Sequence, residues 1–353
     1  MKKLKLVHAL IVLAFFGCEK ENSVETEDPL QTSPTPYKLY IPVGLPDMIF
    51  PENNPLTVEG IALGKKLFYD PILSGDNSIS CGSCHKQNFS FVDSSLQYSV
   101  GIDGLSGTRN SMPLVNLGYQ NNFFWDGGSS TLESQVIGPI ANPVEMHEDL
   151  TNAVNELNAA EKYKEMFRKA FGIETIEIAY VMRAIAQFER TMVSGDSRFD
   201  KFQRGDEGAV MSEQELAGMQ LFVDMGKGDC NHCHVLGSTF SDFAFRNTGL
   251  DSIPIDKGRS LITLNTLDDG KFKTPSLRNI ELTGPYMHDG RFGTLEEVLN
   301  HYNTNFHYTT NLDPNLSNSL KGRMSEQEMI DIIAFLKTLT DYEFINNESF
   351  KNN

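Results

Sequence analysis

Apolar residues recur every three or four positions in five stretches of the chain, which is the spacing of one helix face. The first stretch is Thr57–Tyr69, and Pro71 follows closely enough to end a helix there. The second is Glu174–Met192, whose apolar side chains fall on one face. The other three open with a capping box, a Ser or Thr followed three residues later by Glu: Ser212 with Glu215, Thr294 with Glu297, and Ser325 with Glu328. We therefore expect amphipathic helices in all five stretches.

The connections between these stretches are long and rich in Gly, Asn and Asp, notably residues 94–110 and 242–269. No comparable series of alternating apolar and polar residues predicts strands. The expected fold class is therefore all-α, with long irregular loops between the helices.

The N-terminus has the pattern of an export signal. Three lysines within the first five residues precede an apolar run at 6–16, which is too short to span a membrane, and Gly17-Cys18 follows. This arrangement resembles a bacterial lipoprotein signal, so we expect a signal peptide over 1–18 that ends at a lipidated Cys18. A plain cleaved signal and an uncleaved anchor are the alternatives. Residues 19–45 begin with a stretch poor in large apolar side chains and are expected to form a flexible acidic tether.

The net charge of the chain restricts the classes of molecule that it is expected to bind. The 353 residues carry a formal net charge of -17, and the sequence pI is about 4.9. Such a chain repels phosphate backbones, which disfavours nucleic acid as a partner and is compatible with a basic protein. Past the signal, no apolar run reaches the length of a membrane span, so membrane contact is expected through the lipid anchor only.

Cysteine usage carries the strongest chemical signal. Of five cysteines, Cys18 belongs to the signal, and the other four form two CxxCH strings: Cys81, Cys84 and His85, and Cys230, Cys233 and His234. Two thiols three positions apart can each bond one haem vinyl group, and the following His reaches the iron. A zinc site or a redox dithiol would not need this full pattern twice. We therefore expect two covalently bound c-type haems.

The two strings lie 149 residues apart, and each follows a predicted helix and a short turn, which indicates an internal duplication. A linker-like Gly205–Gly208 segment puts the boundary near 195–210. Sequence alone offers Met, His and Tyr as further iron ligands without choosing among them.

Five strings between Gly60 and Leu339 resemble the bacterial dihaem cytochrome c peroxidase family, which includes the MauG-type enzymes. They are LGKKLFYDPILSGDNSISCGSCH, GTRNSMPLVNLGYQNNFFWDGG, NPVEMH, FKTPSLRNIELTGPYMHDGRFGTLEEV and IDIIAFLKTLT. The resemblance implies two cytochrome c-like haem domains. The expected bounds are 46–205 for a peroxidatic domain, 206–345 for an electron-transfer domain and 346–353 for a tail.

The resemblance also implies roles for single residues. Trp125, the only Trp of the chain, matches the tryptophan that relays electrons between the haems. Gln135 and Glu145 match a pocket glutamine and an acid–base glutamate that moves a peroxide proton from one oxygen to the other. Pro139 matches a proline of the same pocket. The residues that match a calcium site between the domains are Asn110, Thr283 and Pro285.

Two positions depart from many family members. Ile102 stands where a His blocks the peroxidatic iron until reduction, and Ile cannot bind iron, so we expect a permanently open N-terminal haem. Tyr302 stands where the electron-transfer haem has a Met ligand, as in MauG-type enzymes. Tyr302 shares an apolar face with Leu295 and Leu299, which would direct its hydroxyl inward. A core tyrosine is the alternative reading of Tyr302, and Met287 is the alternative ligand.

The sequence thus predicts a peroxidase that reduces hydrogen peroxide to water, with electrons from a small redox protein such as a cytochrome or cupredoxin. A MauG-type enzyme that oxidises a protein partner is the first alternative, and a non-enzymatic electron carrier is the second. The expected location is the periplasm or cell envelope of a Gram-negative bacterium. The expected metals are two haem irons and one calcium ion. Whether the protein is a monomer or a homodimer stays open.

Overall fold

The computed structural model describes residues 33–93 and 96–352, which belong to one compact unit. The predicted signal, Cys18 and the first part of the predicted tether lie outside the described residues. The helix-rich fold expected from the sequence is confirmed, and the only strands in the described part are two residues long each. None of the described helices combines the length and apolar character that crossing a bilayer requires.

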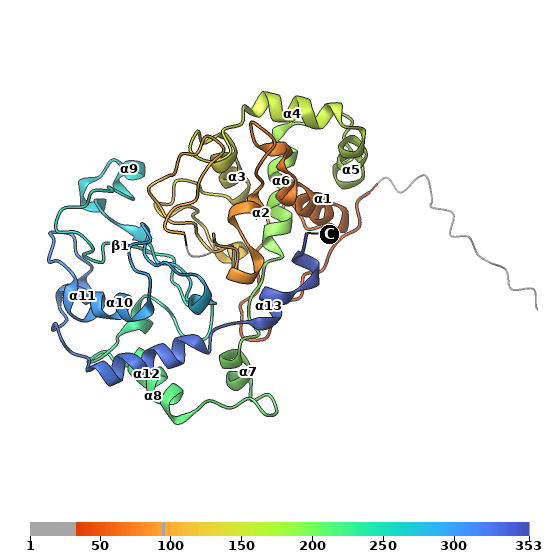
Figure 1. Ribbon diagram of the computed structural model, residues 1–353. Coiled ribbons are helices and arrows are strands. Elements are labelled where there is room, and N and C mark those ends of the chain that lie inside the picture. The colour runs from red at the N-terminus through yellow and green to blue at the C-terminus, as the bar shows by residue number, and fades with distance from the viewer. Residues whose placement is uncertain (1–32, 94–95, 353) are drawn as a thin grey trace, which may run out of the picture. The chain divides into compact units, whose positions relative to one another are not determined.

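The N-terminal half is built on helix α1, which crosses α6 (Figure 1). Its helices are α1 Val58–Tyr69, α2 Cys81–Cys84, α3 Leu132–Ala141, α4 Leu150–Ala159, α5 Glu161–Phe171 and α6 Ile178–Arg190. At the crossing, a Cβ built on Gly64 would lie 1.9 Å from the carbonyl oxygen of Ala184 and 3.0 Å from Phe188. The absence of a side chain at Gly64 therefore lets the two backbones touch.

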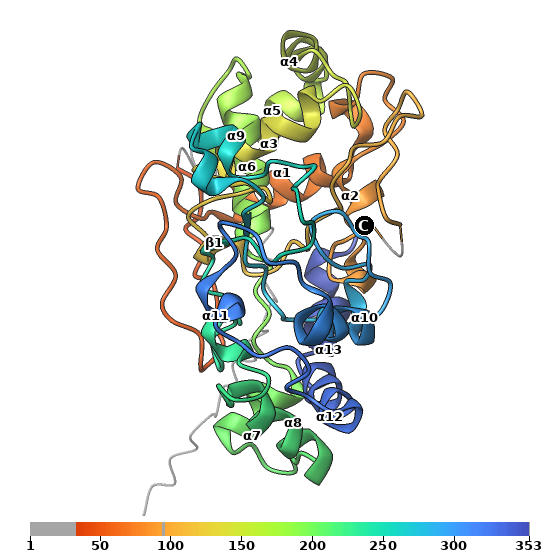
Figure 2. The same cartoon turned by 90° about the vertical axis from the view of Figure 1, so that its left-hand side faces the viewer.

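The C-terminal half repeats this arrangement with α8 and α12, which lie side by side in Figures 1 and 2. Its helices are α7 Arg198–Arg204, α8 Glu213–Val223, α9 Ser260–Thr263, α10 Leu295–Asn300, α11 Pro314–Ser317, α12 Glu326–Lys337 and α13 Tyr342–Asn346. A Cβ built on Gly218 would lie 1.9 Å from the carbonyl oxygen of Asp331 and 3.0 Å from Phe335. The duplication inferred from the two CxxCH strings therefore extends to the helix pair behind each string.

The local helix signals are borne out where the sequence states them most strongly. Ser212, Thr294 and Ser325 each cap a helix through a complete capping box, and Thr57 caps α1. The second predicted helix is shorter than expected at both ends, because it begins after Glu177 rather than at Glu174 and ends at Arg190 rather than at Met192. The long connection at 242–269 is also not wholly irregular. It contains α9 and strand β1 (Phe245–Arg246), which pairs antiparallel with β2 (Phe272–Lys273).

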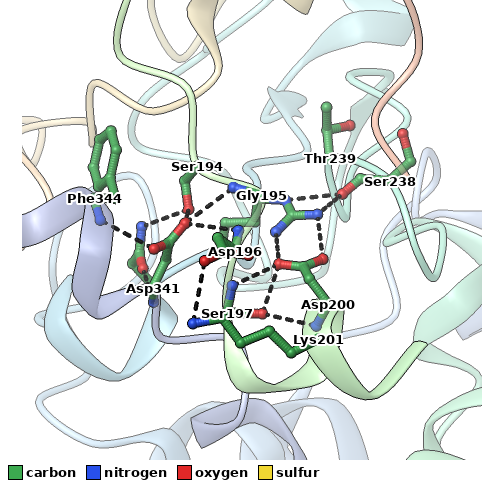
Figure 3. A network of polar contacts seen from close by, with 12 residues as sticks. Ser194, Gly195, Asp196, Ser197, Asp200, Lys201, Ser238, Thr239, Asp341 and Phe344 are labelled. Atoms are coloured by element: carbon green, nitrogen blue, oxygen red, sulfur yellow. Dashed lines mark hydrogen bonds and ion pairs between the residues drawn. The ribbon is translucent and has the colours of Figure 1, made fainter. Parts of the chain in front are cut away.

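A buried polar network fixes the segment that joins the halves (Figure 3). The carboxylate of Asp341 accepts hydrogen bonds from the Ser194 hydroxyl and from the backbone N–H groups of Gly195 and Asp196 at 2.9–3.0 Å. Arg278 makes two hydrogen bonds to Asp200, at 2.8 and 3.0 Å. Because these charges are buried and fully engaged, the junction is held in one arrangement.

The C-terminal residues complete the core of the N-terminal half. Phe344 and Phe350 pack in one cluster with Phe68 and Phe91, and the Tyr69 hydroxyl donates to the Phe350 carbonyl at 2.7 Å. Figure 1 accordingly has α13 and the C-terminus beside α1 and α2. The predicted tail, 346–353, thus begins in a segment that packs in one cluster with Cys81 of the first CxxCH string.

Candidate functional site

The first CxxCH string lines a cavity of about 540 Å³. Cys81 and Cys84 form the ends of the single turn α2, and Ser80 begins it through a capping box with Ser83. Residues three apart on a helix point to the same side, so both thiols face one rim of the cavity. His85 follows at the end of the turn and also lines the cavity.

The imidazole of His85 is held in one orientation by a contact with the backbone. Its Nδ1 lies 2.6 Å from the carbonyl oxygen of Phe91, a fully buried residue whose φ is 60°. This contact leaves Nε2 as the free nitrogen. Burial lowers the pKa of His85, which favours the neutral imidazole that binds metals.

The same cavity is lined by polar groups from α3 and the loop that follows it. Gln135 and Pro139 are four residues apart on one face of α3, and Glu145 follows the helix. The Asn142 side-chain amide donates to the Glu145 carboxylate at 2.6 Å. Burial nevertheless raises the pKa of Glu145, because the charged form is poorly solvated. The structure thus brings Gln135, Pro139 and Glu145 into the cavity of the first string.

Ile102 lies outside this cavity lining. The loop contributes Ser99, Val100 and Gly101, while the Ile102 N–H donates to the Glu145 carbonyl at 3.0 Å and its side chain turns toward Gly75. His85 is the only histidine among the described residues that line the cavity.

The second CxxCH string lines a smaller cavity of about 200 Å³. Cys230 begins a 3₁₀ turn, and Cys233 caps its end. His234 repeats the orientation of the first site, since its Nδ1 lies 3.0 Å from the carbonyl oxygen of Phe240, whose φ is 53°. Burial lowers the pKa of His234 to about 4, so this imidazole is also neutral.

Tyr302 and Met287 both line the second cavity, so the structure leaves both candidate ligands in reach of it. The prediction that Tyr302 continues the helix of Leu295 is wrong in detail. The α-helix ends at Asn300, and Tyr302 lies in a π-helical turn, His301–Asn305. This wider turn rotates the chain but keeps Tyr302 on the cavity side. Burial raises the pKa of the Tyr302 phenol.

Trp125 is one of the residues that line both cavities, and only 8% of it is exposed. Its indole Nε1–H donates to the carbonyl oxygen of Asn110 at 2.9 Å. Asn110 in turn donates its backbone N–H to the carbonyl oxygen of His288 at 2.7 Å, which ties this wall to the C-terminal half. The indole is therefore held between the two cavities by Asn110, whose backbone is itself tied to the C-terminal half.

The three residues matched to a calcium site lie in the lining of the second cavity. The side-chain amide of Asn110 donates to the carbonyl oxygens of Leu96 and Gln97, both at 3.1 Å. The part of the chain that the structure describes contains no cluster of three Asp, Glu, His or Cys side chains arranged for a metal ion. Any calcium here would therefore depend on carbonyl, amide and water oxygens, which are ligands that Ca²⁺ accepts.

Three charged residues that line the first cavity, Arg109, Glu189 and Lys273, were not predicted from the sequence. Glu189 is buried, and burial raises its pKa to about 8; its Oε2 has no hydrogen-bond partner among the described residues. Arg190, its neighbour, is engaged with Glu133. Lys273 is also buried and lines both cavities. Helix α6 also carries Arg183 and Arg190, so no sequence signal singles out Glu189.

The residues present fit a covalently attached haem in each cavity. Each cavity offers two thiols three positions apart and a neutral imidazole whose Nδ1 is engaged with a backbone carbonyl. This is the donor set of c-type haem attachment with a proximal histidine.

Comparisons with known proteins agree with this reading. Residues 58–208 match the family model described as di-haem cytochrome c peroxidase. The chain is 40% identical over 292 residues to the methylamine utilization protein MauG of Methylorubrum extorquens, across 82% of this chain and 80% of that protein. It is 36% identical over 296 residues to the cytochrome c551 peroxidase of Nitrosomonas europaea, across 83% of this chain and 82% of that protein.

A solved structure supports the same relationship. The crystal structure of a MauG-like protein associated with microbial copper homeostasis superposes with a TM-score of 0.81 at 33% sequence identity. The match covers 89% of this chain and 99% of the other. The likeness therefore extends over both CxxCH strings and the helix pairs behind them.

Proposed function

The chain belongs to the di-haem cytochrome c peroxidase family, and we propose that it reduces hydrogen peroxide to water with electrons from a small redox protein. The observation that carries this proposal is the Glu145 carboxyl in the lining of the His85 cavity, which Gln135 also lines. An electron carrier has no need of an acid–base group in this position. The family relationship implies two c-type haems, and the residues of both cavities fit them.

When bound, the haem of the first cavity supplies an iron that can hold peroxide and pass two electrons to it. Glu145 then takes the proton from one peroxide oxygen and returns it to the other, which leaves as water. Asn142 holds the Glu145 carboxyl in place through its 2.6 Å hydrogen bond. The overall reaction consumes two electrons and two protons and converts one hydrogen peroxide into two waters.

We assign the second cavity to the haem that receives electrons, and Trp125 to the path between the two. In support, Trp125 lines both cavities and is held at its indole N–H by Asn110. Tyr302 is our preferred second ligand of this haem, with Met287 as the alternative. A phenolate ligand would give this haem a lower potential than a thioether would.

We further propose a calcium ion held by Asn110, Thr283 and Pro285, two cytochrome c-like domains with a boundary near 205, and a lipid anchor at Cys18 in the cell envelope. The support for the anchor is the N-terminal sequence alone. The support for the calcium ion is the shared position of the three residues in one cavity wall.

A MauG-type reaction, in which peroxide serves to oxidise a protein partner, is the second candidate. Tyr302 favours it, because a phenolate-ligated haem is a poor acceptor from ordinary cytochromes. Ile102 favours it as well, since the absence of His from that position leaves the first haem open without reduction.

One experiment separates the candidates. Purified holoprotein is mixed with hydrogen peroxide, with and without prior reduction and with and without reduced cytochrome c. Fast cytochrome oxidation without prior reduction supports the peroxidase with an open first haem. A long-lived oxidised species with slow cytochrome turnover supports the MauG-type reaction. A protein that does not react with peroxide, or that binds a single haem, would exclude both candidate functions.

A further inference from the structure

Lys273 reaches from the C-terminal half into the wall of the first cavity. It ends strand β2, and its backbone N–H donates to the carbonyl oxygen of Trp125 at 2.8 Å. Its Nζ donates to the Gln120 side-chain oxygen at 2.5 Å and to the Asn122 carbonyl oxygen at 2.7 Å. Both of these partners belong to the N-terminal half, some 150 residues away in the sequence.

The ammonium group of Lys273 is buried and is not paired with a carboxylate of the described residues. Only 2% of Lys273 is exposed, and no carboxylate in the described part of the chain lies within ion-pair distance of its Nζ. Asp126, the acidic residue that acts on Lys273 electrostatically, is already paired with Arg109 at 2.5 Å. Lysine is almost never fully buried unless it is paired, because the desolvated charge is costly.

Two neutral hydrogen-bond partners do not replace an anion. Burial lowers the pKa of Lys273 to about 7, which means that Gln120 and Asn122 do not fully compensate the loss of water. An ammonium has three N–H donors, and two of them are used here. The third donor and the charge are available to an anionic group in the cavity.

The placement of Lys273 selects the cavity in which that anion would lie. Lys273 lines both cavities, but Gln120 and Phe123, which surround its ammonium end, line only the first. A c-type haem is bound through its vinyl groups and keeps two propionates free. These carboxylates are the chemistry that a buried, unpaired ammonium recognises.

We propose that Lys273 binds a propionate of the haem in the first cavity and raises the reduction potential of that haem. The proposal rests on the assignment of one haem to each cavity. A positive charge beside the haem stabilises the reduced form, which carries one more electron than the oxidised form. Because Lys273 comes from β2 of the C-terminal half, that half tunes the peroxidatic haem through this contact.

The test compares Lys273→Met with Lys273→Arg and with a control, Lys271→Met. Lys271 lies two residues earlier, pairs with Asp268 at 3.0 Å and lines neither cavity. The midpoint potential of each haem is measured by spectroelectrochemistry on holoprotein with two haems per chain. We expect Lys273→Met to lower the potential of the first haem by a tenfold change in its one-electron equilibrium, about 59 mV.

The second haem should keep its potential in Lys273→Met, which separates the proposed contact from a general loss of structure. Arginine pairs with carboxylates, so Lys273→Arg should retain most of the wild-type potential of the first haem. Lys271→Met removes the same charge from a partly exposed position outside both cavities and should change the potential of neither haem.

Three outcomes would overturn the proposal: an unchanged first-haem potential in Lys273→Met, an equal shift of both haems, or an equal shift in Lys271→Met. Should Lys273→Met fail to fold, a first-haem potential in Lys273→Gln equal to that of Lys273→Arg would overturn it as well. Failure of the proposed function is distinguishable, because it would appear in the wild-type protein as a missing haem or as indifference to peroxide.

Discussion

The two haem-attachment regions rest on the same kind of helix pair, but the residues that face the histidine across the cavity differ between them. In each half a glycine, Gly64 or Gly218, lets two helices touch. In each half the Nδ1 of the histidine also lies within hydrogen-bond distance of the carbonyl oxygen of a buried Phe. These shared features position the cysteines and the imidazole. They do not determine the reaction of the bound haem, because they lie on the same side of the cavity as the cysteines and the histidine.

The difference lies in the groups that face the histidine from elsewhere in each cavity. The first cavity is larger, about 540 Å³, and holds a carboxyl at Glu145 and an amide at Gln135. The second, about 200 Å³, holds a phenol at Tyr302 and a thioether at Met287, which are ligand-type side chains. A duplicated attachment unit can thus serve catalysis in one copy and electron transfer in the other through changes in a few facing residues.

The largest effect is expected from removing the acid–base group of the first cavity. Glu145→Gln should reduce turnover of peroxide by about 10²–10⁴-fold, the usual contribution of general acid–base catalysis. Both haems should remain attached, since Glu145 contacts neither cysteine string through a hydrogen bond in the described structure. Stopped-flow measurement of the reaction with peroxide checks the loss.

The control for this variant is Glu148→Gln. Glu148 is buried, accepts from the Asn152 amide at 3.1 Å and does not line the cavity. Its turnover should match the wild type. Equal losses in the two variants would mean that the Glu145 effect is structural.

The pH profile offers a second measurement on the same variant. Burial raises the pKa of Glu145, so its carboxylate form is lost at a higher pH than for an ordinary glutamate. Proton abstraction needs the carboxylate, and wild-type turnover should therefore fall as the pH drops through this raised pKa. The residual turnover of Glu145→Gln should lack that step.

The next effect concerns the ligand of the second cavity. Tyr302→Phe should change the absorption spectrum and raise the potential of the second haem, because the choice of axial ligand tunes haem potentials over about 0.8 V. Met287→Leu should leave both unchanged. The first haem should be unaffected in either variant. The reverse pattern, with a change in Met287→Leu only, would make Met287 the ligand.

The contrast between the cavities was only partly predictable from the sequence. The attachment strings are local, and so are the capping boxes of Ser212, Thr294 and Ser325, because all their partners lie within a few residues. Helices α4 and α5 were not predicted. Their apolar residues do recur at helical spacing, at Leu150, Ala153 and Leu157 in α4 and at Tyr163, Phe167 and Ala170 in α5, but neither helix opens with a capping box.

Features that depend on contacts across the fold could not be predicted from the spacing of apolar residues. Lys273 reads as an ordinary surface lysine, and only contacts with Gln120 and Asn122 across the fold reveal that it is buried. Likewise, the π-helical turn at Tyr302 has no signature in an apolar pattern that continues at helical spacing. The resemblance to known proteins suggested the roles of Trp125 and Glu145, whereas the structure supplies their shared surroundings.

The smallest expected effect concerns the feature that the two halves share, which is the glycine at each helix crossing. In Gly64→Ala and in Gly218→Ala, the new methyl group would lie 1.9 Å from a backbone carbonyl oxygen of the partner helix. Backbone cannot move aside as a side chain can, so the helices must separate, and overpacking of this kind typically costs about 1–3 kcal/mol. The higher helix propensity of alanine returns at most about 1 kcal/mol.

We therefore expect both variants to lower the free energy of unfolding by similar amounts, measured by denaturant titration of the holoprotein. Gly107→Ala serves as the control, because a Cβ there would meet nothing closer than Val144 at 3.9 Å. The expectation of similar losses follows from the matched contacts with Phe188 and Phe335 behind the two carbonyls. If one half tolerated alanine and the other did not, the two supports would not be equivalent, and the functional difference could no longer be attributed to the facing residues alone.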